Sequence, residues 1–184
     1  MEPERPAFWA FLPNFLPEAR FALEDPGYYM VSRTLQSRGI PFDAVATDSE
    51  GLCVDQLRKS RAAICLVTPS NQFPLGVTMR VNRRTQLLNW AGEEEGRYLV
   101  EDDYDSDYRY ALKPPPALHT LDTSGRVIYC NTFVRTLSPS LRIAYMVLPP
   151  SLIARYLLRR RYYACTVSAF EQRTLWRFIK GGSY

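Results

Sequence analysis

The sequence predicts a three-layer α/β fold, in which a mostly parallel sheet carries helices on both faces. Short apolar runs typical of strands alternate along the chain with segments of helical periodicity. The runs at 62–67 and 127–130 are apolar throughout, which is typical of parallel strands buried on both sides. The 184 residues suffice for about one domain with a proper core.

The first strand is expected at 21–24 and the second at 42–46. Between them, Asp25 can cap a helix that Pro26 opens and Gly39 ends. That helix would carry three apolar side chains on one face, namely Tyr28, Val31 and Leu35.

A short helix at 55–60 then leads to the apolar strand at 62–67, which ends in the turn-rich sequence TPSNQFPLG. A longer helix follows from 79 to 95 and stops at Gly96. Its inward side chains are expected to be Val81, Leu88 and Ala91. The strand at 98–100 delivers the acidic sequence EDDYDSDYRY.

The last strands are expected at 127–130 and 143–148, and Ser151 is placed to cap a final helix. That helix contains the basic sequence ARYLLRRRYY, which predicts an amphipathic helix with a basic outer face. Its apolar side chains at helical spacing are Leu152, Ile153, Tyr156 and Leu157. Since the chain contains no helix-turn-helix or zinc-finger pattern, no direct contact with DNA is expected from it.

Composition excludes several classes of protein. Apolar residues make up 46% and charged residues 23%, the balance of a soluble globular protein, and no apolar run approaches the roughly 18–20 residues of a membrane span. The N-terminus lacks the basic start of a signal peptide, so we expect a cytoplasmic protein. With four scattered cysteines and one histidine, no metal site is expected.

Ligands of such sheets bind beyond the carboxyl ends of the strands, which selects the loops 68–76, 101–109 and 131–142. The second loop holds five carboxylates, those of Glu101, Asp102, Asp103, Asp105 and Asp107. They are compatible with a divalent cation site, although the glycine and the spaced carboxylate of a calcium loop are absent. They equally fit one buried carboxylate facing a cationic ring nitrogen while the others are solvated, or a solvent-facing acidic turn.

The third loop offers hydroxyl groups together with Arg142. Hydroxyls, a guanidinium group and free backbone N–H groups after a strand are suited to an anionic phosphate. A hydroxyl-rich turn with an arginine salt bridge explains the same residues, and the sequence does not separate the two interpretations.

Five segments, in order, resemble the aminotransferase-like domain of MocR-type regulators, a subgroup of the GntR family. They are LEDPGYY (23–29), VTPSNQFPLGVTM (67–79), VEDDYDSDYRY (100–110), RVIYCNTFVRTLSPSLRIAYMVLPP (126–150) and TVSAFEQRTLWRFI (166–179). That domain is similar to the large domain of fold-type I, class I/II aminotransferases, which depend on pyridoxal 5′-phosphate (PLP). The resemblance therefore implies a PLP-binding domain.

The family's site residues are carried over by position. The resemblance implies that Asp102 pairs with the pyridinium nitrogen, which keeps the ring electron-withdrawing, and that Tyr104 hydrogen-bonds the ring oxygen. It places Tyr28 against the ring at the mouth of the site. Three further positions complete the implied site, with Thr132 and Arg142 at the phosphate and Asn71, where histidine is commonest, near the ring oxygen.

Arg135 stands where the family has the lysine that bonds covalently to the cofactor aldehyde. That bond requires a neutral amine, and a guanidinium group has no accessible neutral form. We therefore expect Arg135 to be inactive in this role and PLP, if bound, to be held non-covalently. Two alternatives stay open: an active aminotransferase that takes its amine from elsewhere, and a truncated remnant that binds nothing.

The resemblance also implies a domain division: an irregular segment at 1–20, a partial large domain at 21–165, and the start of a connection to a missing small domain at 166–184. The family's winged-helix region is likewise expected to be missing, which predicts a truncated form. By resemblance, the expected partners are an amino acid or amine ligand and a second copy in a homodimer, with no membrane.

Overall fold

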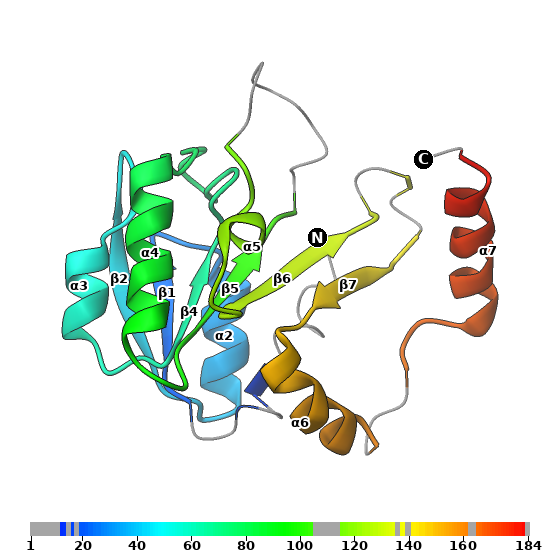
Figure 1. Cartoon of the computed structure of the whole chain (residues 1–184), viewed down its shortest axis with the longest axis horizontal. Helices are drawn as coiled ribbons and strands as arrows, with labels where there is room; N and C mark the ends of the chain where they lie inside the picture. Colours follow the sequence, from blue (N-terminus) through cyan, green and yellow to red (C-terminus); the bar gives the residue numbers. More distant parts are fainter. Residues whose placement is uncertain are drawn as a thin grey trace.

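The computed structural model describes residues 12–13, 16, 19–104, 115–134, 137–138, 141–161 and 165–182. A seven-stranded sheet forms its centre, with the strand order β3-β2-β1-β4-β5-β6-β7 (Figure 1). The strands are β1 (Phe21–Asp25), β2 (Phe42–Asp48), β3 (Gly51–Leu52), β4 (Ile64–Val67), β5 (Tyr98–Asp102), β6 (Val127–Thr132) and β7 (Ala144–Val147). The five central strands pair in parallel, whereas the edge strands β3 and β7 pair antiparallel to their neighbours.

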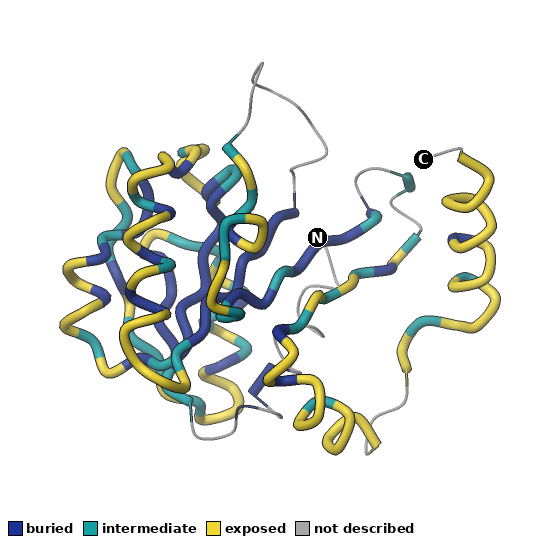
Figure 2. Tube along the Cα trace, viewed as in Figure 1, coloured by how far each residue is buried: buried dark blue, intermediate teal, exposed yellow. Residues whose placement is uncertain are grey.

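Helices cover both faces of this sheet, which confirms the predicted three-layer fold. They are α2 (Tyr29–Ser37), α3 (Val54–Lys59), α4 (Val81–Glu93), α5 (Leu118–Leu121), α6 (Pro150–Arg160) and α7 (Ala169–Lys180). Because successive strand residues point to opposite faces, Phe21 joins a core with α2 and α6, whereas Ala22 joins a second core with α3 and α4. The strands β1, β4, β5 and β6 are therefore largely buried on both sides, as the apolar runs at 62–67 and 127–130 predicted for β4 and β6, whereas β2 is only partly buried (Figure 2).

Both predicted helix caps are wrong. Asp25 still pairs with Ala46 in the β1–β2 ladder, so α2 begins only at Tyr29 and the N-cap position falls to Tyr28. Ser151 lies inside the first turn of α6, because the helix begins at Pro150, a residue suited to the first helical position. The Ser151 hydroxyl instead lies 3.2 Å from the hydroxyl of Tyr98.

The predicted inner face of α4 is correct at Ala91 but wrong at Val81, which is 51% exposed. The helix is rotated so that Arg84, Leu87 and Trp90 point inward. The predicted inner face named only apolar residues and did not include Arg84, which is buried.

The two C-terminal helices bury little. In α6 the basic outer face is present, but only Leu152 of the predicted apolar side chains is buried. In α7 only Leu175 is buried, and Figure 2 shows the rest of this helix almost entirely exposed. Among the helices of the described ranges, none has the length and apolar character required to cross a bilayer.

Candidate functional site

The predicted loops begin side by side at one edge of the sheet. The parallel register places Val67 opposite Glu101 and Asp102 opposite Cys130, so β4, β5 and β6 end next to one another. Residues 105–110, 135–136 and 139–140 of these loops lie outside the described residues, and Arg135 is among them.

Tyr104 joins the second loop to the first. This tyrosine is buried two residues after the buried Asp102 at the end of β5, and its hydroxyl donates a hydrogen bond of 2.9 Å to the backbone carbonyl of Asn71. The structure therefore brings Tyr104 and Asn71 together, next to Asp102 in the chain.

Tyr28 reaches the same loop from the other side. It is half-buried before α2, and its ring meets that of Phe73 edge-on, with 5.8 Å between ring centroids. Because Phe73 and Asn71 belong to one turn, the loop at 68–76 connects Tyr28 with Tyr104.

Thr132 and Arg142 lie where β6 and β7 meet. The Thr132 hydroxyl donates to the carbonyl oxygen of Ile143 at 3.2 Å and accepts from the backbone N–H of Val134 at 3.2 Å. Arg142 precedes Ile143 and is exposed. These contacts bring the backbone around the two predicted phosphate residues together and leave the Arg142 side chain in contact with solvent.

The acidic loop differs from its prediction. The carboxylates of Glu101, Asp102 and Asp103 are all buried. For these three residues, the interpretation with a single buried carboxylate and the interpretation as a solvent-facing turn are therefore both wrong. The two further carboxylates, Asp105 and Asp107, lie outside the described residues. Among the described residues, no group of three or more His, Cys, Asp or Glu is arranged to hold a metal ion.

Each extra buried acid has its own donors. The two carboxylate oxygens of Glu101 accept from the backbone N–H groups of Leu118 at 2.7 Å and His119 at 2.9 Å. Asp103 accepts from the Tyr129 hydroxyl at 2.8 Å, and burial together with this acid raises the pKa of Tyr129. Burial raises the pKa of Glu101 to about 7, although the two N–H groups and a nearby arginine act in the opposite direction.

That arginine is Arg84, which sequence reasoning missed. Its guanidinium lies 3.9 Å from Glu101 with both side chains fully buried, and it donates to the carbonyl oxygens of Met79 at 3.0 Å, Pro116 at 3.0 Å and Pro69 at 2.8 Å. The signal was its helical spacing to Leu87 and Ala91. Arg84 thus binds both ends of the 69–79 segment and Pro116, which lies just before α5.

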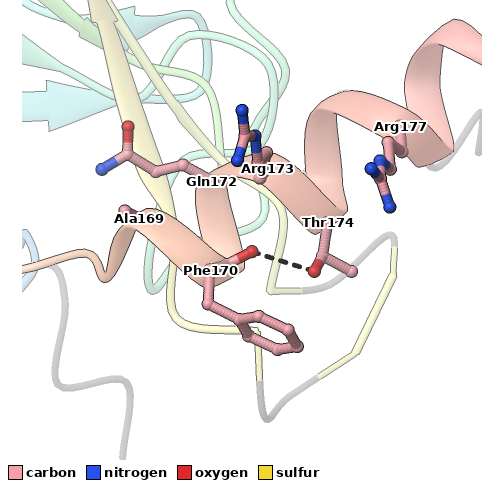
Figure 3. A pocket seen from close by; sticks show the side chains of 6 residues that line it. All are labelled: Ala169, Phe170, Gln172, Arg173, Thr174 and Arg177. Carbon is pink, nitrogen blue, oxygen red and sulfur yellow. Dashed lines mark hydrogen bonds between the residues drawn. The ribbon is translucent and has the colours of Figure 1, made fainter.

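A pocket of the described part of the chain lies elsewhere. It measures about 610 Å³ and is lined only by residues of α7, namely Ala169, Phe170, Gln172, Arg173, Thr174 and Arg177 (Figure 3). It contains no acidic side chain and none of the predicted site residues. We therefore assign the candidate site to the edge of the sheet.

A comparison with descriptions of known protein families finds no match. Among curated proteins, the uncharacterized HTH-type transcriptional regulator YdeL of Bacillus subtilis is 41% identical over 170 residues, which are 92% of this chain and 36% of YdeL. The probable rhizopine catabolism regulatory protein MocR of Rhizobium meliloti is 43% identical over 130 residues, which are 71% of this chain and 26% of that protein. The curated homologues of this chain include HTH-type transcriptional regulators, MocR among them. The chain spans about a third of their length.

Solved structures confirm the fold. The Pyrococcus horikoshii kynurenine aminotransferase, solved in complex with PMP, matches with a TM-score of 0.84 and 28% identity over 97% of this chain and 47% of that one. The multiple substrate aminotransferase of Thermococcus profundus matches with a TM-score of 0.84 and 30% identity, over 98% of this chain and 47% of that one. The MocR-type resemblance and the aminotransferase fold predicted from the sequence are both confirmed.

Proposed function

We propose that this chain is the PLP-binding, aminotransferase-like domain of a MocR-type regulator and that it binds the cofactor without a covalent bond. The observation that carries the proposal is the hydrogen bond from Tyr104 to the Asn71 carbonyl, which joins two of the predicted cofactor loops beside the buried Asp102. The regulator homologues and the aminotransferase structures agree with this assignment.

The residues at this edge fit the chemistry of PLP. A buried carboxylate such as Asp102 is suited to a nearby cation, and a protonated pyridine nitrogen is one. The Tyr104 hydroxyl would exchange its bond to the Asn71 carbonyl for one to the ring oxygen, Tyr28 would offer an aromatic face, and Asn71 would lie on the oxygen side. The Thr132 hydroxyl would exchange its bond to the Ile143 carbonyl for one to the phosphate, to which Arg142 would offer a guanidinium.

PLP, when bound, supplies an electron-withdrawing ring, and the protein supplies its orientation and charge. Arg135 has no neutral form and cannot form the covalent bond, so this domain would sense the cofactor or an amino ligand rather than turn one over. The same proposal includes a homodimer, a cytoplasmic location and the division of the chain into 21–165 and 166–184.

Equilibrium dialysis of the purified protein against PLP tests the proposal. The wild type should retain PLP, and Asp102→Asn and Arg142→Ala should each weaken retention by about 10-fold or more, since a hydrogen bond to a charged group contributes about 1.5–3 kcal/mol. Arg155→Ala, on the exposed side of α6, is the matched control and should bind as the wild type does. Absence of PLP retention in the wild type would overturn the proposal and favour a remnant that binds nothing.

Borohydride treatment tests the non-covalent part. No trapped adduct should form in the wild type, whereas Arg135→Lys should yield one, because a lysine side chain can lose its proton. An adduct at any lysine of the wild type would contradict the proposal. Turnover of an amino donor that disappears in Asp102→Asn would show an active aminotransferase instead.

A further inference from the structure

Two side chains of β6, Tyr129 and Asn131, form a hydrogen-bonded network behind the proposed cofactor site, and neither belongs to that site. The Tyr129 hydroxyl donates to Oδ2 of Asp103 at 2.8 Å, and the side-chain nitrogen of Asn131 donates to the Tyr129 oxygen at 2.9 Å. The side-chain oxygen of Asn131 accepts from the backbone N–H of Thr132 at 2.6 Å. This Asp103–Thr132 network thus runs from the loop after β5 to the end of β6.

The hydrogen bonds of the network all point in one direction. A carboxylate has no hydrogen to give, so the phenol donates to Asp103 and accepts from Asn131. The amide of Asn131 must then turn its nitrogen toward Tyr129 and its oxygen toward Thr132. Burial and the neighbouring acid raise the pKa of Tyr129, so the phenol keeps the hydrogen that this arrangement requires. Hydrogen bonds that continue one another in this way are mutually strengthened.

The network extends the connection between β5 and β6 beyond their backbone pairing. The paired register ends with Asp102 opposite Cys130, and the Asp103 N–H donates to the Cys130 carbonyl at 2.9 Å. The side chains continue the connection to Thr132, two residues further along β6. Asp103 lies between the proposed ring residues Asp102 and Tyr104, and Thr132 is a proposed phosphate residue. The network therefore links the two ends of the proposed site.

The network acts through the backbone rather than by contact with a ligand. Successive residues of a strand point to opposite faces, so Tyr129 and Asn131 share one face of the sheet and the Thr132 side chain points to the other. On its own face, the Tyr129 ring has aromatic neighbours, with ring centroids 5.9 Å from His119 and 6.2 Å from Tyr145.

We propose that Tyr129 and Asn131 are positioning residues that hold the ring-binding end of β5 and the phosphate-binding end of β6 at a fixed separation. This inference rests on the proposed function for its ligand, a pyridine ring that carries a phosphate. A ligand that contacts both ends makes its second contact at an effective concentration that is higher when the separation is fixed. A ligand that contacts one end alone gains nothing from it. The network therefore favours a ring phosphate over either of its fragments.

Tyr129→Phe tests this preference, because it removes one hydroxyl and keeps the ring. Binding of three probes is followed by NMR titration, which also detects millimolar affinities: pyridoxine 5′-phosphate, pyridoxine and inorganic phosphate. None of them has the aldehyde, so each reports non-covalent binding. The affinity for pyridoxine 5′-phosphate should fall about 5-fold, the effect of one hydrogen bond. The affinities for pyridoxine and for phosphate should not change, since each fragment contacts one end only.

Tyr98→Phe is the matched control. Tyr98 is the first residue of β5, at the other end of that strand, and its hydroxyl lies 3.2 Å from the hydroxyl of Ser151. This variant also loses one buried tyrosine hydroxyl, and it should bind all three probes as the wild type does.

Asn131→Ala interrupts the same network and provides a second variant. It should lower the affinity for pyridoxine 5′-phosphate at least as much as Tyr129→Phe does. The double variant should bind no more weakly than Asn131→Ala, because the network is already interrupted. Without any ligand, Asn131→Ala should raise amide hydrogen exchange at Thr132 by about 5-fold or more, since that N–H loses its acceptor.

The outcomes separate the two proposals. An unchanged affinity for pyridoxine 5′-phosphate in Tyr129→Phe would overturn the positioning role and leave the proposed function intact. Equal losses for all three probes, or strictly additive losses in the double variant, would also overturn it, because they indicate a general disturbance of the site. Absence of pyridoxine 5′-phosphate binding by the wild type would overturn the proposed function and the positioning role together.

Discussion

Replacement of Arg84 by methionine tests whether the candidate site is held together by a buried charge. The methionine retains much of the apolar stem and removes the guanidinium, so the volume of the core changes little. Three backbone carbonyl groups then lose their donor, and Glu101 loses a cation 3.9 Å away. The loss is expected to be large because both side chains are fully buried.

The magnitude follows from the uncompensated charge. Removal of one partner from a buried ion pair lowers the free energy of unfolding by about 3–5 kcal/mol. Urea unfolding followed by circular dichroism measures this change. The control is Arg58→Met, which removes an ion pair with Glu93 between two side chains that are 39% and 43% exposed. Such a surface pair contributes about 0–1 kcal/mol.

A double-mutant cycle with Glu101→Gln separates the pair from the rest of the network. The double variant should lose less than the two single variants combined, with a coupling of about 1–3 kcal/mol. Arg84→Met should also increase amide hydrogen exchange between residues 70 and 78, since Arg84 binds the carbonyls of Pro69 and Met79 on either side. A free energy of unfolding within about 1 kcal/mol of the wild type, or strictly additive losses, would refute this reasoning.

Three further predictions concern the end of β1 and the second loop. Glu24 has its pKa raised from an ordinary 4.5 to about 7, so its contribution to stability is fully present below the lower value and is lost as the pH rises through the higher one. Urea unfolding from about pH 4 to pH 8 should show a decline that Glu24→Gln reduces by up to roughly 3 kcal/mol. In Gly27→Ala the new Cβ would lie 2.2 Å from the Glu24 carbonyl oxygen, so thermal unfolding should show a loss of about 1–3 kcal/mol; the control Gly92→Ala, inside α4 with open space around it, should not destabilise. Tyr104→Phe removes the hydrogen bond to Asn71 and should lower the free energy of unfolding in urea by about 1–2 kcal/mol. This loss should be smaller than that in Gly27→Ala. An unchanged free energy of unfolding would contradict the joining of the two loops.

The longer strands of the sheet were predictable because each one is an uninterrupted apolar or alternating run whose burial is a local property of its sequence. The edge strand β3 has two residues, Gly51 and Leu52, and exists only through its pairing with β2. The four-residue helix α5 begins at Leu118, whose backbone N–H donates to the carboxylate of Glu101 in another part of the chain. Neither element has a local signal of that kind.

The helix α7 did have such a signal. Ser168 and Glu171 form a reciprocal capping box, in which each side chain accepts from the other residue's backbone N–H. The spacing of serine and glutamate before an apolar run is readable in the sequence as a helix start. By resemblance, residues 166–184 were expected to be the start of a connection, so no helix was predicted there.

The location of the candidate site was predictable, and its supporting charges were not. Strand ends in a parallel sheet gather their loops at one edge, whatever the residues in those loops. The partners of Glu24 and Glu101 come from 44 and 17 positions further along the chain, so no window of the sequence contains both members of a contact. Two of the three interpretations of the acidic loop placed most of its acids in solvent, whereas the three described ones, Glu101, Asp102 and Asp103, are all buried.

The burial of four acids at one sheet edge limits what this edge is suited to bind. Glu101 faces Arg84, and Asp103 accepts from the phenol of Tyr129, so these two are compensated within the protein. Burial raises the pKa of Glu24 to about 7, so below that pH a proton compensates this acid. A cation placed beside Asp102 is favoured by its carboxylate, whereas an anion there is opposed. In the proposed complex, the phosphate of a zwitterionic ligand would then lie toward the hydroxyl and the arginine at the ends of β6 and β7, and the distribution of charge along the edge would orient the ligand.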